Sequence, residues 1–227
     1  MPWPAFFDTV PKLRIHDPLA ELLGSPDDGI LEFGYADAVR LAGHSCPTVA
    51  AAYWITLRAL HVLYPEQLPV RGGVRVDFRD GLRDGVNGVV ASVVQLLTGA
   101  AGDTGFKGIR GRHVRMGLQR YTPGLPLTLR FTRLDNRHAV DALANLSLLP
   151  EPAGLTQLLQ RCADGSASTA ERAQLQQLWQ ARVAGLLGEL AHNDGIFAIR
   201  PVHRPGGRQT HASLASSGGR LFLDTIL

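Results

Sequence analysis

Two long segments of the chain are apolar on nearly every face of a helix. Positions 47–63 carry an almost uninterrupted apolar run, and positions 88–97 repeat this pattern with Gln95 as the polar exception. A helix with no polar face has to be covered on all sides, so both segments are predicted to be central helices that pack beside each other. Pro65 ends the first of them.

Between and after these helices the pattern changes to the alternation of strands. Positions 70–80 alternate apolar and charged side chains, which is typical of a strand with one face on the core. Segments 113–121, 125–134 and 139–149 are also predicted to be strands, and their short turns favour antiparallel hairpins. The order of elements predicts an α+β fold with a mixed, mostly antiparallel sheet that has the two buried helices on one face.

The N-terminal third contains shorter elements. Residues 1–11 hold aromatic side chains between prolines and are expected to lie extended without regular structure. Asp17 followed by Pro18 predicts a capped helix start. A strand at 30–35 and a short helix at 36–42 follow.

The C-terminal part is predicted to be helical. Ser168 and Glu171 form the spacing of a capping box, which starts a long helix. This helix carries one apolar stripe that is expected to dock on the body or on a second subunit: Leu175, Leu178, Trp179, Val183, Leu186, Leu187 and Leu190.

We therefore divide the chain into a core domain at 1–150, a helical extension at 151–191 that packs on the core, and a tail at 192–227 of uncertain structure. Residues 196–202 within the tail resemble a strand. The sequence does not decide whether the tail crosses the surface, reaches a partner or contributes a metal ligand.

Composition narrows the class of protein. With 227 residues, 45% of them hydrophobic, the chain is long enough for one substantial core. No segment is predicted to cross a membrane and no signal peptide is visible, so a cytoplasmic location is expected. The net charge is +3, but the arginines are scattered among aspartates, and no nucleic-acid binding is predicted. The densest basic cluster, at 107–115, has two interpretations, a plain loop or a segment that meets an anion, and the plain loop is favoured.

The candidate chemistry lies in Gly43-His44-Ser45-Cys46-Pro47, which we call the 43–47 loop. Pro47 at a first helical position places Cys46 at or beside the helix N-cap, where unpaired N–H groups favour a thiolate. His44 lies just before it. A thiolate and an imidazole are a ligand pair that suits zinc and similar divalent metals.

Three segments together resemble the metal-binding domain of the FmdE component of formylmethanofuran dehydrogenase. They are the 43–47 loop, the motif Gln-Leu-Leu-Thr-Gly-Ala at 95–100 and the glycine-rich segment at 102–106. The chain is more closely similar to the stand-alone bacterial proteins of this FmdE-like family. The resemblance covers roughly 17–141, and more loosely the helices to about 190. It implies an α+β fold, a homodimer and a metal held by His44 and Cys46.

The chain departs from this family at two positions. The second cysteine of many members falls near Val89, and the aspartate after it falls near Ser92. The family's cysteine-rich zinc ribbon is also missing. The remaining metal ligands are then water, a small molecule or side chains from elsewhere, and the candidates are Asp37, His16, His113, His203 and His211.

Three functions remain open. The first is a zinc-binding accessory protein or enzyme component of one-carbon or metallocofactor metabolism, with an open site that admits a small-molecule ligand. The second is a redox or acyl-transfer enzyme that uses the Cys46 thiolate with His44 as its base. The third is a non-catalytic interaction protein within a larger assembly. The sequence assigns no reaction, and Cys162 is interpreted as a passive thiol.

Overall fold

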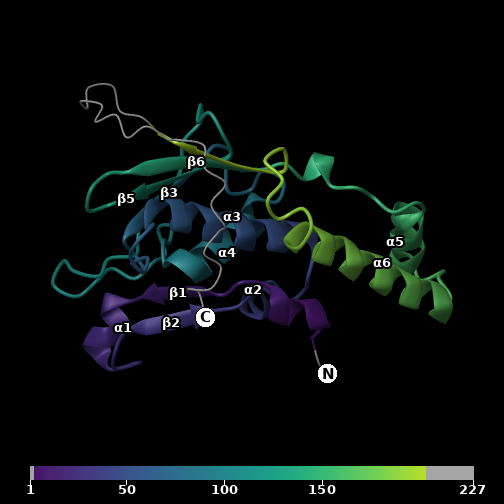
Figure 1. Ribbon diagram of the computed structural model, residues 1–227, viewed down its shortest axis with the longest axis horizontal. Helices are drawn as coiled ribbons and strands as arrows, with labels where there is room; N and C mark the ends of the chain where they lie inside the picture. The colour runs from purple at the N-terminus through teal and green to yellow at the C-terminus, as the bar shows by residue number, and fades with distance from the viewer. Residues whose placement is uncertain (1–2, 203–227) are drawn as a thin grey trace, which may run out of the picture.

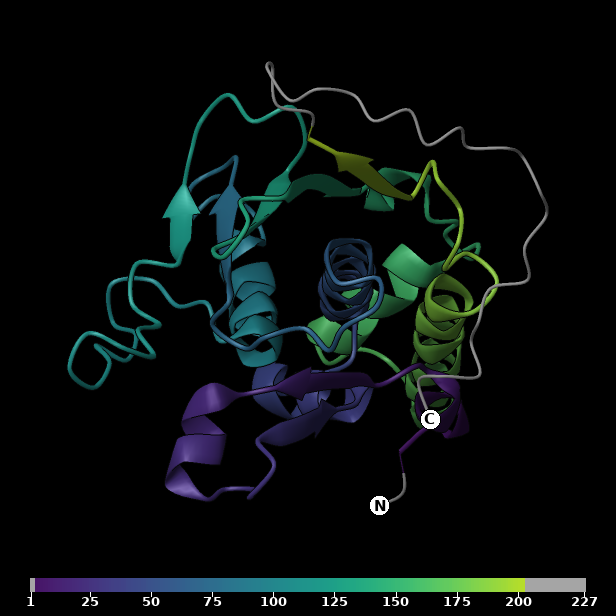
Figure 2. The same cartoon turned by 60° about the vertical axis from the view of Figure 1, so that its left-hand side comes forward.

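The architecture is layered around one central helix, α3 (Pro47–Leu63). The computed structural model describes residues 3–202. A five-stranded sheet lies on one side of α3 and a two-stranded sheet lies on the other, as Figure 1 shows. The predicted α+β fold with a mixed sheet is confirmed. Viewed end-on in Figure 2, α3 is also flanked by α4 (Asn87–Thr98) and α6 (Thr169–Leu187).

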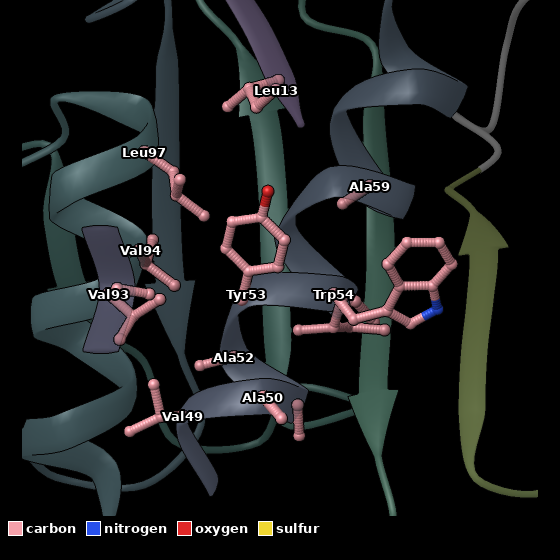
Figure 3. Close-up of a cluster of buried hydrophobic side chains, with 14 of the residues drawn as sticks. Leu13, Val49, Ala50, Ala52, Tyr53, Trp54, Ala59, Val93, Val94 and Leu97 are labelled. Atoms are coloured by element: carbon pink, nitrogen blue, oxygen red, sulfur yellow. The ribbon is translucent and has the colours of Figure 1, made fainter. Parts of the chain in front are cut away.

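This enclosure explains why α3 has no polar face. Tyr53 points to one side, where its hydroxyl lies 2.7 Å from the Pro11 carbonyl and 3.0 Å from the Phe33 carbonyl. The Trp54 indole points to another side and donates to the Ala191 carbonyl at 2.7 Å. Figure 3 shows both rings together with the valines that reach toward α3 from α4. Both of these polar groups on α3 therefore have partners.

The large sheet has the strand order β4-β3-β5-β6-β7. Its antiparallel part consists of β3 (Val74–Phe78), β5 (Leu129–Arg133), β6 (Ala139–Ala144) and β7 (Phe197–Pro201), with each strand paired to the next. Strand β7 falls where the sequence resembles a strand, so this part of the C-terminal segment belongs to the sheet. Residues 203–227 of the predicted tail lie outside the described residues.

One predicted pairing is wrong. Strand β4 (Gln119–Tyr121) does not form a hairpin with β5 but pairs parallel to β3 at the edge of the sheet. The cause is α4, which connects β3 to β4: a strand that returns through a helical crossover runs parallel to its predecessor. The predicted strand at 113–121 shortens to its last three residues.

The small sheet pairs β1 (Leu13–His16) with β2 (Ile30–Phe33). The sequence pattern does not predict β1. Residues Ala5–Thr9 form a 3-10 helix, η1, where no regular element is expected. Helix α1 (Pro18–Leu23) begins as predicted, with the Asp17 carboxylate accepting from the N–H groups of its first turn.

The C-terminal helices are α5 (Leu155–Ala163) and α6, after the short 3-10 helix η2 (Leu146–Leu148). The capping box of Ser168 and Glu171 is present. In Figure 1 these helices extend to the side of the layered body, and α6 contacts α3. The C-terminal part of the apolar stripe, with Val183, Leu186 and Leu187, is buried in the same chain. That half of the stripe is therefore not a free surface for a second subunit.

Within residues 3–202, no helix combines the length and the apolar character that crossing a membrane would require.

Candidate functional site

The 43–47 loop connects α2 (Tyr35–Ala42) to α3. Helix α2 ends at Gly43, whose φ of 77° is the left-handed conformation that glycine adopts without strain. Cys46 is the N-cap of α3 and Pro47 its first residue, as predicted. The Cys46 Sγ accepts from the Val49 N–H at 3.5 Å, and Cys46 is 8% exposed. The sulfur therefore lies at the positive end of the α3 dipole.

His44 is exposed and is oriented by the end of α2. Its Nδ1 lies 3.0 Å from the Ala42 carbonyl oxygen. Because a carbonyl oxygen only accepts, Nδ1 carries the proton in this contact. In the neutral ring Nε2 then has a free lone pair, which is the arrangement found in metal-binding histidines whose other nitrogen donates to a carbonyl.

Ser45 links the loop to α2 and to α6. Its hydroxyl donates to Gln180 at 3.0 Å and lies 2.9 Å from the Tyr35 hydroxyl. The Trp179 indole donates to the Ser45 carbonyl at 2.9 Å. Burial raises the pKa of Tyr35 well above its ordinary value, the Ser45 hydrogen bond opposes this rise and nearby Cys46 adds to it. Tyr35 stays a neutral hydroxyl.

Sequence reasoning missed the two α6 residues that hold the loop. It placed Trp179 in the apolar stripe and did not assign Gln180 a role. The available signal is that Trp179 has an indole N–H and Gln180 an amide, both in a segment that is expected to dock on the core. A buried indole N–H or amide needs a partner, and here the loop supplies it.

The region around Val89 forms a shallow hollow of about 210 Å³ between α2 and α4. Val89 and Ser92 line it, together with Ala42, whose carbonyl orients His44. The Ser92 hydroxyl donates to the Gly88 carbonyl at 2.9 Å. This wall therefore offers apolar groups and an already bonded hydroxyl, and none of its lining residues carries a thiol or a carboxylate.

The other proposed ligands have different partners. His16 pairs with Glu21 at 2.8 Å, and the Asp37 carboxylate accepts from the Gly34 N–H and from Arg40. His113 lines a second hollow beside Arg115. His203 and His211 lie outside the described residues. Among residues 3–202, no three His, Cys, Asp or Glu side chains are grouped so that they could hold a metal ion.

The 43–47 loop thus supplies two donors that fit zinc in chemistry but do not complete a coordination sphere. No protein-family model matches the sequence, and no curated protein matches it either.

Proposed function

We propose that the chain is a metal-binding protein similar to the FmdE component of formylmethanofuran dehydrogenase, and that it holds zinc or a similar divalent ion through His44 and Cys46. The observation that carries this proposal is the 3.0 Å contact between His44 Nδ1 and the Ala42 carbonyl oxygen. Because Nδ1 donates to this carbonyl, the His44 Nε2 is free to bind a metal two residues from a thiol at a helix N-cap. The role proposed is an accessory or enzyme component of one-carbon or metallocofactor metabolism.

The site is proposed to be open. Zinc is bound tetrahedrally in most structural sites, and catalytic sites keep a position for water or substrate. His44 is exposed whereas Cys46 is 8% exposed, so we propose that the vacant positions lie on the His44 side of the metal. A small molecule or a donor from a second copy of the chain can reach them, and we propose a homodimer on this ground.

The proposed location is the cytoplasm. Cys46 and Cys162 are both free thiols. Free thiols persist in reducing compartments, where metal binding by a thiolate is also favoured over disulfide formation.

The thiolate enzyme has less support. A reactive cysteine needs a partly exposed sulfur next to a base, whereas Cys46 is 8% exposed. Within residues 3–202 no hydrogen bond joins the Cys46 sulfur to the His44 ring, although a thiolate enzyme needs such a contact with its base: the ring contacts the Ala42 carbonyl and the sulfur accepts from the Val49 N–H.

The experiment is a zinc titration of the purified full-length chain and its Cys46→Ser variant. Serine is a better N-cap than cysteine, so the variant keeps the start of α3 and is expected to fold. We expect it to lose zinc binding, whereas Cys162→Ser, which removes the other thiol, binds as the wild type does. His44→Gln is paired in the same way with His61→Gln, an exposed histidine on α3.

Equal zinc binding by Cys46→Ser and Cys162→Ser would overturn the proposed site. Failure of Cys46→Ser to fold, with Cys162→Ser intact, would contradict the open site, because the metal would then be structural.

A further inference from the structure

A second hollow, of about 360 Å³, is lined by basic side chains and lies apart from the 43–47 loop in sequence. It is formed by the segment that precedes β3 and by the glycine-rich segment that precedes β4. The lining residues that matter here are Arg71, Gly72, Arg112, His113 and Arg115. We call this feature the arginine hollow.

Arg71 and Arg115 meet at one buried carboxylate. The Asp17 side chain is 5% exposed; its Oδ2 accepts from Arg71 Nη1 at 3.0 Å and its Oδ1 from Arg115 Nη2 at 2.7 Å. Oδ1 also accepts from the Leu19 and Ala20 N–H groups. Burial opposes ionisation of Asp17, but these hydrogen bonds and the Arg115 charge outweigh it and lower its pKa. Oδ1 therefore accepts from three donors and Oδ2 from one.

One carboxylate offsets only one of the two guanidinium groups. The buried Arg115 Nη1 and Arg71 Nε have no hydrogen-bond partner within residues 3–202. The Arg115 side chain is 8% exposed, and its burial lowers the pKa of the guanidinium, with nearby Arg71 adding to this effect and Asp17 opposing it. Buried charge without full compensation is costly, so a site of this kind favours an added anion.

The backbone around Arg115 is shaped for this side chain. Gly72 has φ +78°, and a Cβ there would fall on the Arg115 guanidinium. A Cβ at Gly99 would also lie 2.6 Å from Arg115 Nη1. The two glycines let the guanidinium lie directly against the main chain.

His113 and Val114, which also line the hollow, carry two further backbone N–H groups. His113 has φ 57°, a left-handed conformation next to the exposed Arg112. In the part of the chain that the structure describes, the N–H groups of His113 and Val114 donate to no backbone carbonyl. Backbone N–H groups near a left-handed residue are a common element of anion-binding loops.

We propose that the arginine hollow binds a small molecule through a phosphate group. Arg71, Arg112 and Arg115 against Asp17 leave an excess of two positive charges. A phosphate monoester carries about −1.5 to −2 near neutral pH, so it balances this excess better than one carboxylate does. The hollow's volume of about 360 Å³ lies in the lower part of the range of small-molecule sites, roughly 300–1,000 Å³.

The test is a titration of the ¹⁵N-labelled full-length chain with inorganic phosphate at low ionic strength, followed by amide chemical shifts. We expect saturable shifts at Gly72, Gly73, His113 and Val114, and much weaker ones with acetate. Arg112→Gln is expected to weaken phosphate binding roughly fivefold, as for a partly solvated ion pair.

The matched control is Arg110→Gln, because Arg110 is an exposed arginine on the same segment that does not line the hollow. It is expected to bind phosphate as the wild type does. The proposal is overturned if phosphate produces no saturable shifts at these amides, if acetate binds as tightly, or if the Arg110 and Arg112 variants weaken binding equally. Each of these results leaves the zinc proposal unaffected.

Discussion

The Asp17 carboxylate allows the strongest test of how the buried charges stabilise the fold. Replacing Asp17 by Asn keeps the size of the side chain and one oxygen, but puts an NH₂ group where a second carboxylate oxygen now accepts from arginine. Two guanidinium groups then share a neutral partner. Breaking a buried ion pair costs about 3–5 kcal/mol. Because Arg71 is partly solvated, with 23% of its side chain exposed, we expect a loss near the lower end, about 3 kcal/mol.

The assay is equilibrium unfolding in urea of the wild type and the variant. The matched control is Asp135→Asn, since Asp135 also pairs with an arginine but has 59% of its side chain exposed. The Asp135 carboxylate is solvated, although its partner Arg133 is 11% exposed, so we expect removal of its charge to cost at most about 1 kcal/mol. A loss in Asp17→Asn no larger than that in Asp135→Asn would refute the claim that the buried cluster stabilises the fold.

The pH dependence gives a second test with the same variant. The pKa of Asp17 is lowered in the folded protein from an ordinary value of 3.8. Its contribution to stability is therefore fully present above that value and is lost as pH falls through the lowered pKa. The difference in unfolding free energy between wild type and Asp17→Asn should be constant from neutral pH to about 5 and should shrink below about 4. A difference that grows on acidification would contradict this assignment.

Three further substitutions test separate contacts. Tyr53→Phe removes the donor of the Pro11 and Phe33 carbonyls and should lower the free energy of unfolding by about 1–3 kcal/mol, whereas Tyr121→Phe should change it by under about 0.5. Gly72→Ala should lower the free energy of unfolding by at least about 2 kcal/mol. This loss should exceed that of Gly85→Ala, because Gly85 also has a positive φ but has no atom within 4 Å of the added Cβ. Trp179→Phe removes the hydrogen bond from the indole to the Ser45 carbonyl and should weaken zinc binding about tenfold. The zinc affinity is measured by competition with a chromogenic chelator. Unchanged affinity would show that α6 does not position the loop.

The elements that the sequence predicts well are those whose signals are local. The N-caps at Asp17, Cys46 and Ser168 appear at the predicted residues, because a cap depends on a few neighbouring positions. The apolar surface of α3 likewise predicts its central position. Alternation predicts β3 and β5 but not their neighbours in the sheet.

The errors concern contacts between distant segments. The parallel pairing of β4 depends on the crossover through α4, and the alternation in 113–121 carries no information about it. In the same way, the Trp179 and Gln180 bonds to Ser45 join positions more than a hundred residues apart. Asp17 is predicted as a cap, yet its pairing with Arg71 and Arg115 is visible only in the fold.

The same distinction between local signals and contacts in the fold applies to the candidate site. The N-cap position of Cys46 follows from Pro47, whereas the His44 orientation follows from a carbonyl at the end of α2 that no sequence pattern indicates. The sequence shows Val89 and Ser92 as departures from the resemblance to the FmdE component, and the structure adds that these residues line a hollow with Ala42.

The most direct test of the central proposal is the zinc content of the full-length protein as purified. Elemental analysis after gel filtration, with the mass determined by light scattering on the same fractions, should give about one zinc or similar divalent ion per chain and the mass of a dimer. A metal-free protein that takes up no zinc at neutral pH would contradict the proposal that His44 and Cys46 form a metal site.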